Sequence, residues 1–336
     1  MTKIELWDLG CMLFPNVTTF DDIEEYIKSE RFHTSKNIFT NTKRLMSELK
    51  TDNVLELYRD NKKTSEWIES DNAPPSNASK LMYYSALNYL SNPDKSKIAH
   101  KISKSKRRYF LDKANELGKI VRKEDGKNKL DSREKQAILP WKYIVSCYSR
   151  NRHTLNDDQQ LIAALYLAGG DNPAGSPRRL DYNAIRIYHR MPDNPNHSEN
   201  YIIIHSSDNI DIVLQEFKTR KYYGPYNARL PVKVSRIIGD SVLRKPRSWL
   251  IENDEGGPIT AKQLGQRIRT TTAKLTGTPI GASNLRKSFI TWLYEKPGMT
   301  EGRLEVYAKA MNHSPSEQKL YRRKDINKTV KNLINN

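Results

Sequence analysis

The sequence predicts a mainly helical protein with a small antiparallel β-sheet, arranged as two domains. The chain has 336 residues, which is roughly twice the length of an average domain. Apolar residues recur at spacings of three or four along most of it. Only the segments 182–190, 201–206 and 211–219 are rich in Ile, Val and Tyr at strand-like lengths, with turn-forming residues between them.

The N-terminal part contains helical patterns without an intervening strand pattern. Its helices are expected at 21–30, 36–50, 53–69, 77–91 and 96–118. A polar and charged stretch follows and ends in a proline just before the next apolar segment. The sequence therefore predicts an N-terminal segment at 1–34, a helical domain at 35–125, a linker at 126–140 and a second domain at 141–336.

The second domain is expected to open with two helices, continue into the three strands and return to helix after Pro231. The opening helices are predicted at 141–151 and 156–168. The later ones are predicted at 232–243, 260–276, 282–295, 301–311, 315–323 and 325–334.

The charge of the chain favours a polyanionic partner. Fifty-seven Lys and Arg against 39 Asp and Glu give a net charge of +18, which is typical of nucleic-acid-binding proteins. Residues 91–150 hold seventeen bases against seven acids, whereas residues 1–30 hold two bases against seven acids. The densest part, 95–110, is the predicted DNA-backbone contact, although a solvated basic helix face is the alternative. Its candidate residues are Lys97, Lys101, Lys104, Lys106, Arg107 and Arg108.

Composition excludes several other classes of protein. With 37% apolar residues, 15 glycines and 16 prolines, the chain is neither collagen-like nor of low complexity. Two cysteines, Cys11 and Cys147, cannot make a disulfide framework or a cysteine zinc site, which favours a reducing compartment. The longest apolar run, 161–168, is far shorter than the ~20 residues that span a bilayer, and the start lacks a secretory-signal layout. We therefore expect an intracellular protein with no membrane partner.

The second domain carries an ordered set of basic residues that ends in a tyrosine. No Gly-rich phosphate loop, His-Glu-x-x-His or Gly-x-Ser-x-Gly motif is present. The set consists of Arg178 in GSPRRLDY, Lys218 in EFKTRKYYG, Arg286 in SNLRKSFITWL, His313 in AMNHS and Tyr321 in KLYRR.

In this order and context, the set resembles the hallmark of the tyrosine recombinase (integrase) family. That hallmark is an arginine, a hairpin lysine, a His-x-x-Arg box, a His-or-Trp box and a terminal tyrosine nucleophile, and the resemblance covers roughly residues 35–325. It implies a two-domain clamp on double-stranded DNA, with a helical core-binding domain and a catalytic domain. It also implies strand cleavage and rejoining through a covalent 3′-phosphotyrosine, with no metal or other cofactor. A homotetramer on two DNA sites is expected, and an accessory DNA-bending protein is a further partner that such enzymes can use.

The chemistry of phosphodiester cleavage explains why these residue types belong together. Guanidinium groups suit the non-bridging oxygens of a phosphate that gains negative charge in the transition state, which assigns Arg178 and Arg286 to a clamp. Lys218 matches the family's general acid for the leaving 5′ oxygen. His313 would donate a hydrogen bond to the phosphoryl group, and Tyr321 would attack phosphorus.

Two features depart from the family pattern. Ser283 stands where the family usually has the histidine of His-x-x-Arg, and a serine cannot act as a base at neutral pH, so its role stays open between hydrogen bonding and none. The spacing of eight residues from His313 to Tyr321 is slightly short. Arg179 and Lys221 are the alternatives to Arg178 and Lys218. The DNA-binding candidates of this domain are Arg179, Arg220, Lys221 and Lys287.

Three functions stay open from the sequence. The leading one is a site-specific recombinase or integrase of a virus or mobile element, acting in a prokaryotic cytoplasm, a host nucleus or a viral factory. A type IB topoisomerase or telomere resolvase would use the same residues. A basic DNA-binding factor without catalysis is the third.

Overall fold

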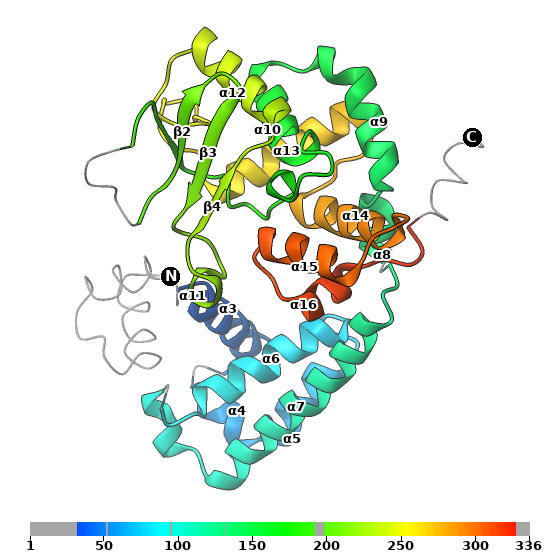
Figure 1. Ribbon diagram of the computed structural model, residues 1–336. Helices are drawn as coiled ribbons and strands as arrows, with labels where there is room; N and C mark the ends of the chain where they lie inside the picture. The colour runs from blue at the N-terminus through cyan, green and yellow to red at the C-terminus, as the bar shows by residue number, and fades with distance from the viewer. Residues whose placement is uncertain (1–31, 52, 95, 131, 192–197, 327–336) are drawn as a thin grey trace. The chain divides into compact units, whose positions relative to one another are not determined.

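The computed structural model describes residues 32–51, 53–94, 96–130, 132–191 and 198–326 (Figure 1). By its internal contacts the chain divides into two compact units, residues 1–127 and 128–336. The helix expected at 21–30, and most of the helix expected at 325–334, lie outside the described residues.

The first unit is helical throughout its described part, and α6 and α7 lie side by side (Figure 1). Its helices are α3 (Phe32–Leu49), α4 (Glu56–Arg59), α5 (Asn61–Glu69), α6 (Asn77–Leu90), the 3-10 helix η1 (Lys97–Lys101) and α7 (Lys104–Gly126). The helix predicted at 53–69 is divided at Asp60, whose backbone is not helical and whose side chain accepts a hydrogen bond from the Lys63 amide at the start of α5. The unit has its own core, in which Tyr58 and Phe110 meet edge to face.

The second unit contains all the remaining elements. They are α8 (Ser132–Ala137), α9 (Trp141–Asn151), η2 (Arg152–Thr154), α10 (Asp157–Leu167), η3 (Pro173–Gly175), β1 (Ile185–Tyr188), β2 (Asn200–Ser206), β3 (Asn209–Leu214), α11 (Arg220–Tyr223), β4 (Tyr226–Arg229), α12 (Val232–Arg244), α13 (Ala261–Thr276), α14 (Ala282–Glu295), α15 (Glu301–Ala310) and α16 (Pro315–Tyr321). Helix α8 lies within the stretch that the sequence predicts as a linker.

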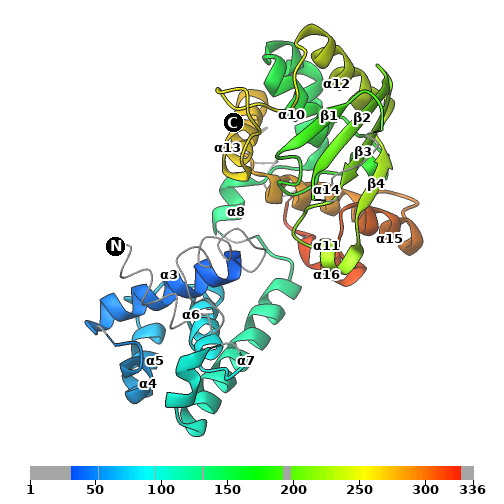
Figure 2. The same cartoon turned by 90° about the vertical axis from the view of Figure 1, so that its left-hand side faces the viewer.

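The prediction of a mainly helical chain with a small sheet is confirmed, but the sheet is mixed. Its four strands run in the order β1-β2-β3-β4 (Figure 2), and β1 pairs with β2 in parallel while the other pairs are antiparallel. The wholly antiparallel expectation is therefore wrong, because apolar strand patterns are alike for either direction. Strand β4 was not predicted, since its sequence YNAR holds no Ile or Val and only alternate residues are partly buried.

Helix α10 is the centre of the second unit. All residues from Leu161 to Leu167 are buried, and the helix packs against α9, α12 and α13. A capping box between Asn156 and Gln159 satisfies backbone amides at its N-terminus. No described helix, α10 included, is long and apolar enough to cross a membrane.

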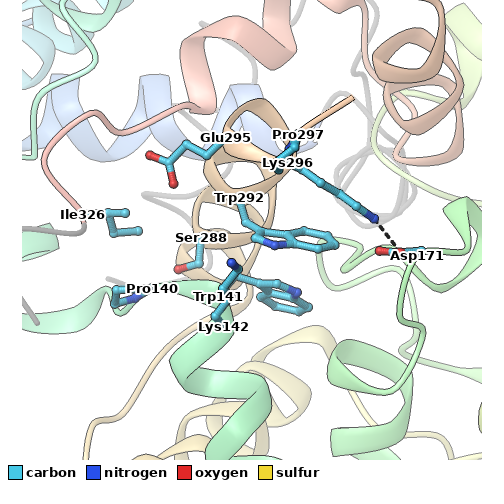
Figure 3. Close-up of a pocket in the computed structure, with 10 residues that line it drawn as sticks. All are labelled: Pro140, Trp141, Lys142, Asp171, Ser288, Trp292, Glu295, Lys296, Pro297 and Ile326. Atoms are coloured by element: carbon cyan, nitrogen blue, oxygen red, sulfur yellow. Dashed lines mark ion pairs between the residues drawn. The ribbon is translucent and has the colours of Figure 1, made fainter. Parts of the chain in front are cut away.

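A pocket of about 500 Å³ opens between the ends of α9 and α14 (Figure 3). Trp141 and Trp292 line it, and Lys296 at its rim forms an ion pair of 2.5 Å with Asp171. None of the predicted catalytic residues lines this pocket. The candidate site is therefore a different place, built around α15 and α16.

Candidate active site

Arg178 lies in the segment that follows the central helix α10. Gly169 and Gly175 pack backbone against backbone there, and any side chain at Gly169 would collide with the Gly175 carbonyl. This close approach precedes Arg178, whose side chain is only 2% exposed. Its Nε lies 3.4 Å from Asp181 Oδ2, and its Cζ lies 4.1 Å from the centre of the Tyr226 ring, a cation–π distance.

The C-terminus of α15 is shaped to present His313. The Asn312 amide donates to the Lys309 carbonyl (3.0 Å) and the His313 amide donates to the Ala308 carbonyl (3.1 Å), which together make a Schellman motif. Asn312 takes the left-handed conformation (φ 53°) that this motif requires, and asparagine tolerates it better than most residues. His313 is therefore the first residue beyond a rigid helix end.

The carbonyl groups at and just beyond the C-terminus of α15 accept hydrogen bonds from other site residues. The donors to the carbonyl oxygens of Ala310, Met311 and Asn312 are, in order, Arg178 Nη1, Arg286 Nη2 and Thr219 Oγ1. A helix C-terminus leaves these carbonyls without intrahelical partners and carries partial negative charge. It therefore stabilises the two buried guanidinium groups and fixes them beside His313.

Arg286 projects from α14 into the same cluster and is 1% exposed. Its Nη2 lies 2.9 Å from His313 Nδ1, and its Cζ lies 5.5 Å from the centre of the Tyr321 ring. Burial lowers the pKa of Arg286 to about 10; Tyr321 opposes this change and Arg179 adds to it. The guanidinium is therefore charged at neutral pH although it is out of contact with water.

His313 is a neutral hydrogen-bond donor in this environment. Burial, and then the charges of Arg286 and Arg179, lower its pKa from 6.5 to about 3. An arginine only donates hydrogen bonds, so His313 Nδ1 must accept from Arg286. The proton of the neutral ring is then on Nε2, which becomes a donor to whatever enters the site.

Tyr321 is the last residue of α16. This short helix is capped at its N-terminus by Ser314, whose side chain accepts a hydrogen bond from the Glu317 amide. Arg179 Nη2 donates a hydrogen bond of 2.7 Å to Tyr321 Oη. Arg179 is itself held by its backbone carbonyl, which accepts from the Tyr166 hydroxyl on α10 at 2.5 Å. A charged donor on the phenol oxygen stabilises negative charge that develops there, as a nucleophile needs.

Several buried donors of the cluster lack partners. Arg286 Nε, Arg286 Nη1 and His313 Nε2 make no hydrogen bond within the part of the chain that the structure describes. Buried donors without partners are costly, and native proteins keep few of them. Three guanidinium groups, those of Arg178, Arg179 and Arg286, lie in this cluster, and the Asp181 carboxylate pairs with Arg178. A cluster of several cations whose buried donors lack partners among the described residues suits an oxyanion such as a phosphodiester.

Lys218 borders the cluster without joining it. It lies in the turn between β3 and α11, so the expectation of a position on the sheet itself is wrong. Phe217 lies 5.9 Å from Arg178 Cζ, and Thr219 donates to the Asn312 carbonyl (3.0 Å), so both neighbours of Lys218 touch the cluster. The side chain of Lys218 is exposed.

Ser283 is not brought into the cluster. It is exposed in the first turn of α14, three residues before the buried Arg286. The structure thus collects Arg178, Arg286, His313 and Tyr321, places Lys218 beside them and leaves Ser283 outside.

The basic residues of the first unit differ in how they are used. Lys101 and Lys104 are exposed, while Lys106 donates to the Arg59 carbonyl and Arg108 pairs with Asp112 at 2.9 Å. Arg107 is half-buried on α7, and the Lys97 side chain lies outside the described residues.

The basic candidates of the second unit also separate. Lys221 is exposed with its Nζ 4.9 Å from the centre of the Tyr222 ring, and Arg220 pairs with Glu216 at 3.7 Å. Lys287 instead forms an ion pair with the buried Glu134, so its charge is used inside the unit.

Sequence reasoning missed two features of the site. Arg179 was predicted as an alternative clamp residue and a DNA contact, whereas in the structure it donates a hydrogen bond to the Tyr321 hydroxyl. Gln318, fully buried on α16, raises the pKa of His313 and so opposes the effect of burial, although its side-chain atoms make no hydrogen bond with the described residues. The paired arginines at 178 and 179 were the available signal for the first; nothing in the sequence marks Gln318.

The chain is similar in structure to several solved protein chains. A crystal structure of XerA recombinase is similar over 90% of this chain and 98% of its own length, with 12% sequence identity and a TM-score of 0.36. That likeness is too weak to assign a family. No protein-family model matches the chain, and no curated protein matches it.

Proposed function

We propose that this protein is a site-specific DNA recombinase that cleaves and rejoins DNA strands through a covalent 3′-phosphotyrosine. The observation that carries the proposal is the position of Tyr321 Oη, 2.7 Å from Arg179, beside the inward donors of Arg286 and His313. The motif order found in the sequence supports the same reaction.

In the proposed step, Tyr321 Oη attacks the phosphorus of a phosphodiester and the bond from phosphorus to the 5′ oxygen breaks. The phenol proton leaves to solvent as the O–P bond forms. Arg178, Arg286 and His313 Nε2 donate to the non-bridging oxygens, where charge develops in the transition state. The bond energy is kept in the phosphotyrosine, so a 5′ hydroxyl can later reverse the step.

The leaving 5′ oxygen takes up a proton, and Lys218 is the proposed donor. Its turn is fixed to the site through Thr219, while its side chain is exposed. A flexible ammonium on a fixed turn can follow the oxygen as it departs.

Duplex DNA is the proposed partner of the exposed bases on the first unit. Lys101 and Lys104 are exposed and lie at the N-terminal end of α7, in the most basic stretch of the sequence. Contacts of this kind add affinity that is independent of base sequence and falls with salt.

The test is trapping of a covalent adduct on nicked DNA. A pool of nicked duplexes with randomised sequence loses the short 5′-hydroxyl fragment after cleavage, so the protein stays linked to the 3′ phosphate. Tyr321→Phe removes one hydroxyl, and we expect it to bind the pool like the wild type while forming no adduct. Tyr188→Phe, which removes a hydroxyl bonded to Glu199 on the sheet, is the matched control and should form adduct normally.

Mass spectrometry of the linked peptide identifies the attacking residue. Adduct that persists in Tyr321→Phe, or that maps to another peptide, would show that Tyr321 is not the nucleophile. Relaxation of supercoiled plasmid without exchange between two sites would favour a topoisomerase instead.

A further inference from the structure

The chain immediately after Tyr321 is fastened by Arg323. Its guanidinium donates to the Leu320 carbonyl (2.7 Å) and the Arg322 carbonyl (3.1 Å) at the end of α16, where carbonyl groups have no acceptor role within the helix itself. Its backbone amide donates to Thr291 Oγ1 (2.9 Å), a fully buried hydroxyl on α14. Arg323 therefore fixes the end of the helix whose last residue is Tyr321.

Arg323 is in turn held by Glu134 on α8. The carboxylate is 6% exposed and accepts two parallel hydrogen bonds, Nε to Oε2 at 2.8 Å and Nη2 to Oε1 at 3.1 Å. Lys287 also donates to Oε1. Burial alone would raise the pKa of Glu134, but the bonds from Arg323 and Lys287 outweigh it and lower the pKa below its ordinary 4.5.

Further contacts join the same two parts of the chain. The Lys324 amide donates to the Asn128 carbonyl (2.9 Å), and Ile326 packs in a small buried cluster with Leu130 and Ile138. Ile326 lies in the same region as Pro140 and Ser288 in Figure 3. Residues 128–139, which we call the strap, therefore contact residues 323–326 at three successive points.

The strap is also anchored to α14. Asn284 donates to the Ala137 carbonyl (3.0 Å) and Ser288 donates to the Leu139 carbonyl (2.6 Å). These two donors lie either side of Arg286 on the same helix. The strap is thus tied both to the helix of the phosphate clamp and to the segment behind the nucleophile.

We propose that Glu134 is a positioning residue for Tyr321, acting through Arg323. The proposal rests on the proposed function, because it assigns to the strap the placement of the attacking oxygen. A nucleophile displaced by about 1 Å can lose on the order of 100-fold in rate, so a fixed end of α16 matters for chemistry as well as for folding. The strap directly follows residue 127, where the first unit ends, so it is the segment by which the chain enters the second unit.

A structural role alone would loosen the whole second unit evenly. A positioning role predicts a local effect instead, because the hydrogen bonds of Arg323 among the described residues run to α8, α14 and the end of α16. Hydrogen–deuterium exchange separates the two, since it reports the opening of individual backbone segments.

The experiment compares Glu134→Gln with Asp158→Asn in the full-length protein. Asp158→Asn breaks a different carboxylate–arginine pair, with Arg267 on α13 at 3.1 Å, and serves as the matched control. For Glu134→Gln we expect adduct formation at saturating nicked DNA to slow by roughly 10- to 100-fold. DNA affinity should stay within about twofold, because the change leaves the exposed bases Lys101, Lys104 and Lys218 untouched. Amides of 319–324 should exchange faster while those of α10 and α13 do not.

Thr291→Val is the second variant, and it keeps the test valid if Glu134→Gln does not fold. It removes the acceptor of the Arg323 amide with little change in volume and should produce the same local pattern. Adduct rates within twofold of wild type in both variants, or exchange that rises evenly over the unit, would overturn the proposal. Absence of adduct from the wild type would instead overturn the proposed recombinase function, while the exchange result would still decide whether Glu134 holds α16.

Discussion

Arg286 and Lys287 are neighbours on α14 and belong to two groups of cations with opposite surroundings. Lys287 turns toward Glu134, which it shares with Arg323, so that two cations meet one carboxylate through several hydrogen bonds. Arg286 turns toward His313 and the end of α15, where two of its nitrogens stay without partners among the described residues. The first group is complete within the protein. The second keeps donors without partners among the described residues, as binding of the proposed phosphodiester would require.

The difference shows how to separate structural from functional arginines when both are buried. Low exposure does not distinguish them, since Arg286 is 1% and Arg323 is 7% exposed. The partners distinguish them, because a structural guanidinium has its donors filled and a functional one keeps donors available. Substitution at each member should therefore have opposite consequences for stability and for chemistry.

The largest effect on stability is expected from Arg323→Met. It removes Arg323 as a partner of the buried Glu134 carboxylate, and loss of one partner from a buried pair costs about 3–5 kcal/mol. Chemical denaturation of the full chain, followed by a probe in the second unit, measures the loss. A change below about 1 kcal/mol would mean that the two groups are not energetically different.

Arg286→Met should do the reverse. We expect adduct formation to fall roughly 100- to 1,000-fold, because a transition-state donor is removed. Stability should change by less than about 1 kcal/mol, because a desolvated cation with two unfilled donors is replaced by a side chain that needs none. Single-turnover kinetics and denaturation on the same preparation give both numbers. A stability loss as large as that of Arg323→Met would remove the distinction between the groups.

Acid should affect the two groups in different pH ranges. The pKa of His313 is lowered to about 3 in the folded protein, so only the unfolded chain binds a proton at this residue as the pH falls below 6.5. Stability is then lost with falling pH, by about 2 kcal/mol between neutral pH and pH 5. His313→Gln should flatten this part of the curve.

Glu134 acts at lower pH. Its pKa is lowered below 4.5, so its stabilisation is present above that value and is lost only as the pH falls further. Denaturation midpoints measured from pH 7 down to about pH 3 separate the two windows. A His313→Gln curve parallel to the wild type above pH 5 would contradict a neutral buried histidine.

The smallest effect concerns the solvated bases of α7, which belong to neither group. Lys104 is exposed and forms no ion pair with the described residues, whereas Arg108 is paired with Asp112. Lys104→Ala should reduce the slope of log affinity against log salt by about 1, the loss of a single phosphate contact. Arg108→Ala should change it less, because its charge is already partly neutralised. Salt titration of duplex binding measures both slopes.

Much of the site could be predicted from residue order, because each member stands in a local pattern that marks it. Arg178, Arg286, His313 and Tyr321 do meet in the structure. Their partners could not be predicted, since the bond from Arg179 to Tyr321 joins residues 142 positions apart and depends on tertiary packing. Lys218 was expected on a strand because 211–219 is one of the segments rich in Ile, Val and Tyr at strand-like length, but β3 ends at Leu214.

The fold shows the same division between local and distant information. Helix patterns were visible wherever an apolar stripe repeats, as in α13 with its Thr260–Gln263 capping box. The strap was expected as a linker because its sequence is polar, yet Glu134 is buried by two cations that come from residues 287 and 323. A charged residue becomes part of an interior only through such distant partners, and hydropathy does not record them.

The length of α16 fixes the direction in which the Tyr321 side chain leaves the helix. Successive residues of an α-helix are turned by about 100° around its axis, so the direction of the Tyr321 side chain is an angular phase counted from the Ser314 cap. One inserted residue between His313 and Tyr321 would swing the phenol by about 100° away from Arg179, and a full extra turn would restore its direction but displace it by about 5 Å along the axis. The eight-residue interval is therefore a part of the site in its own right, and single substitutions that leave its length unchanged would never expose it.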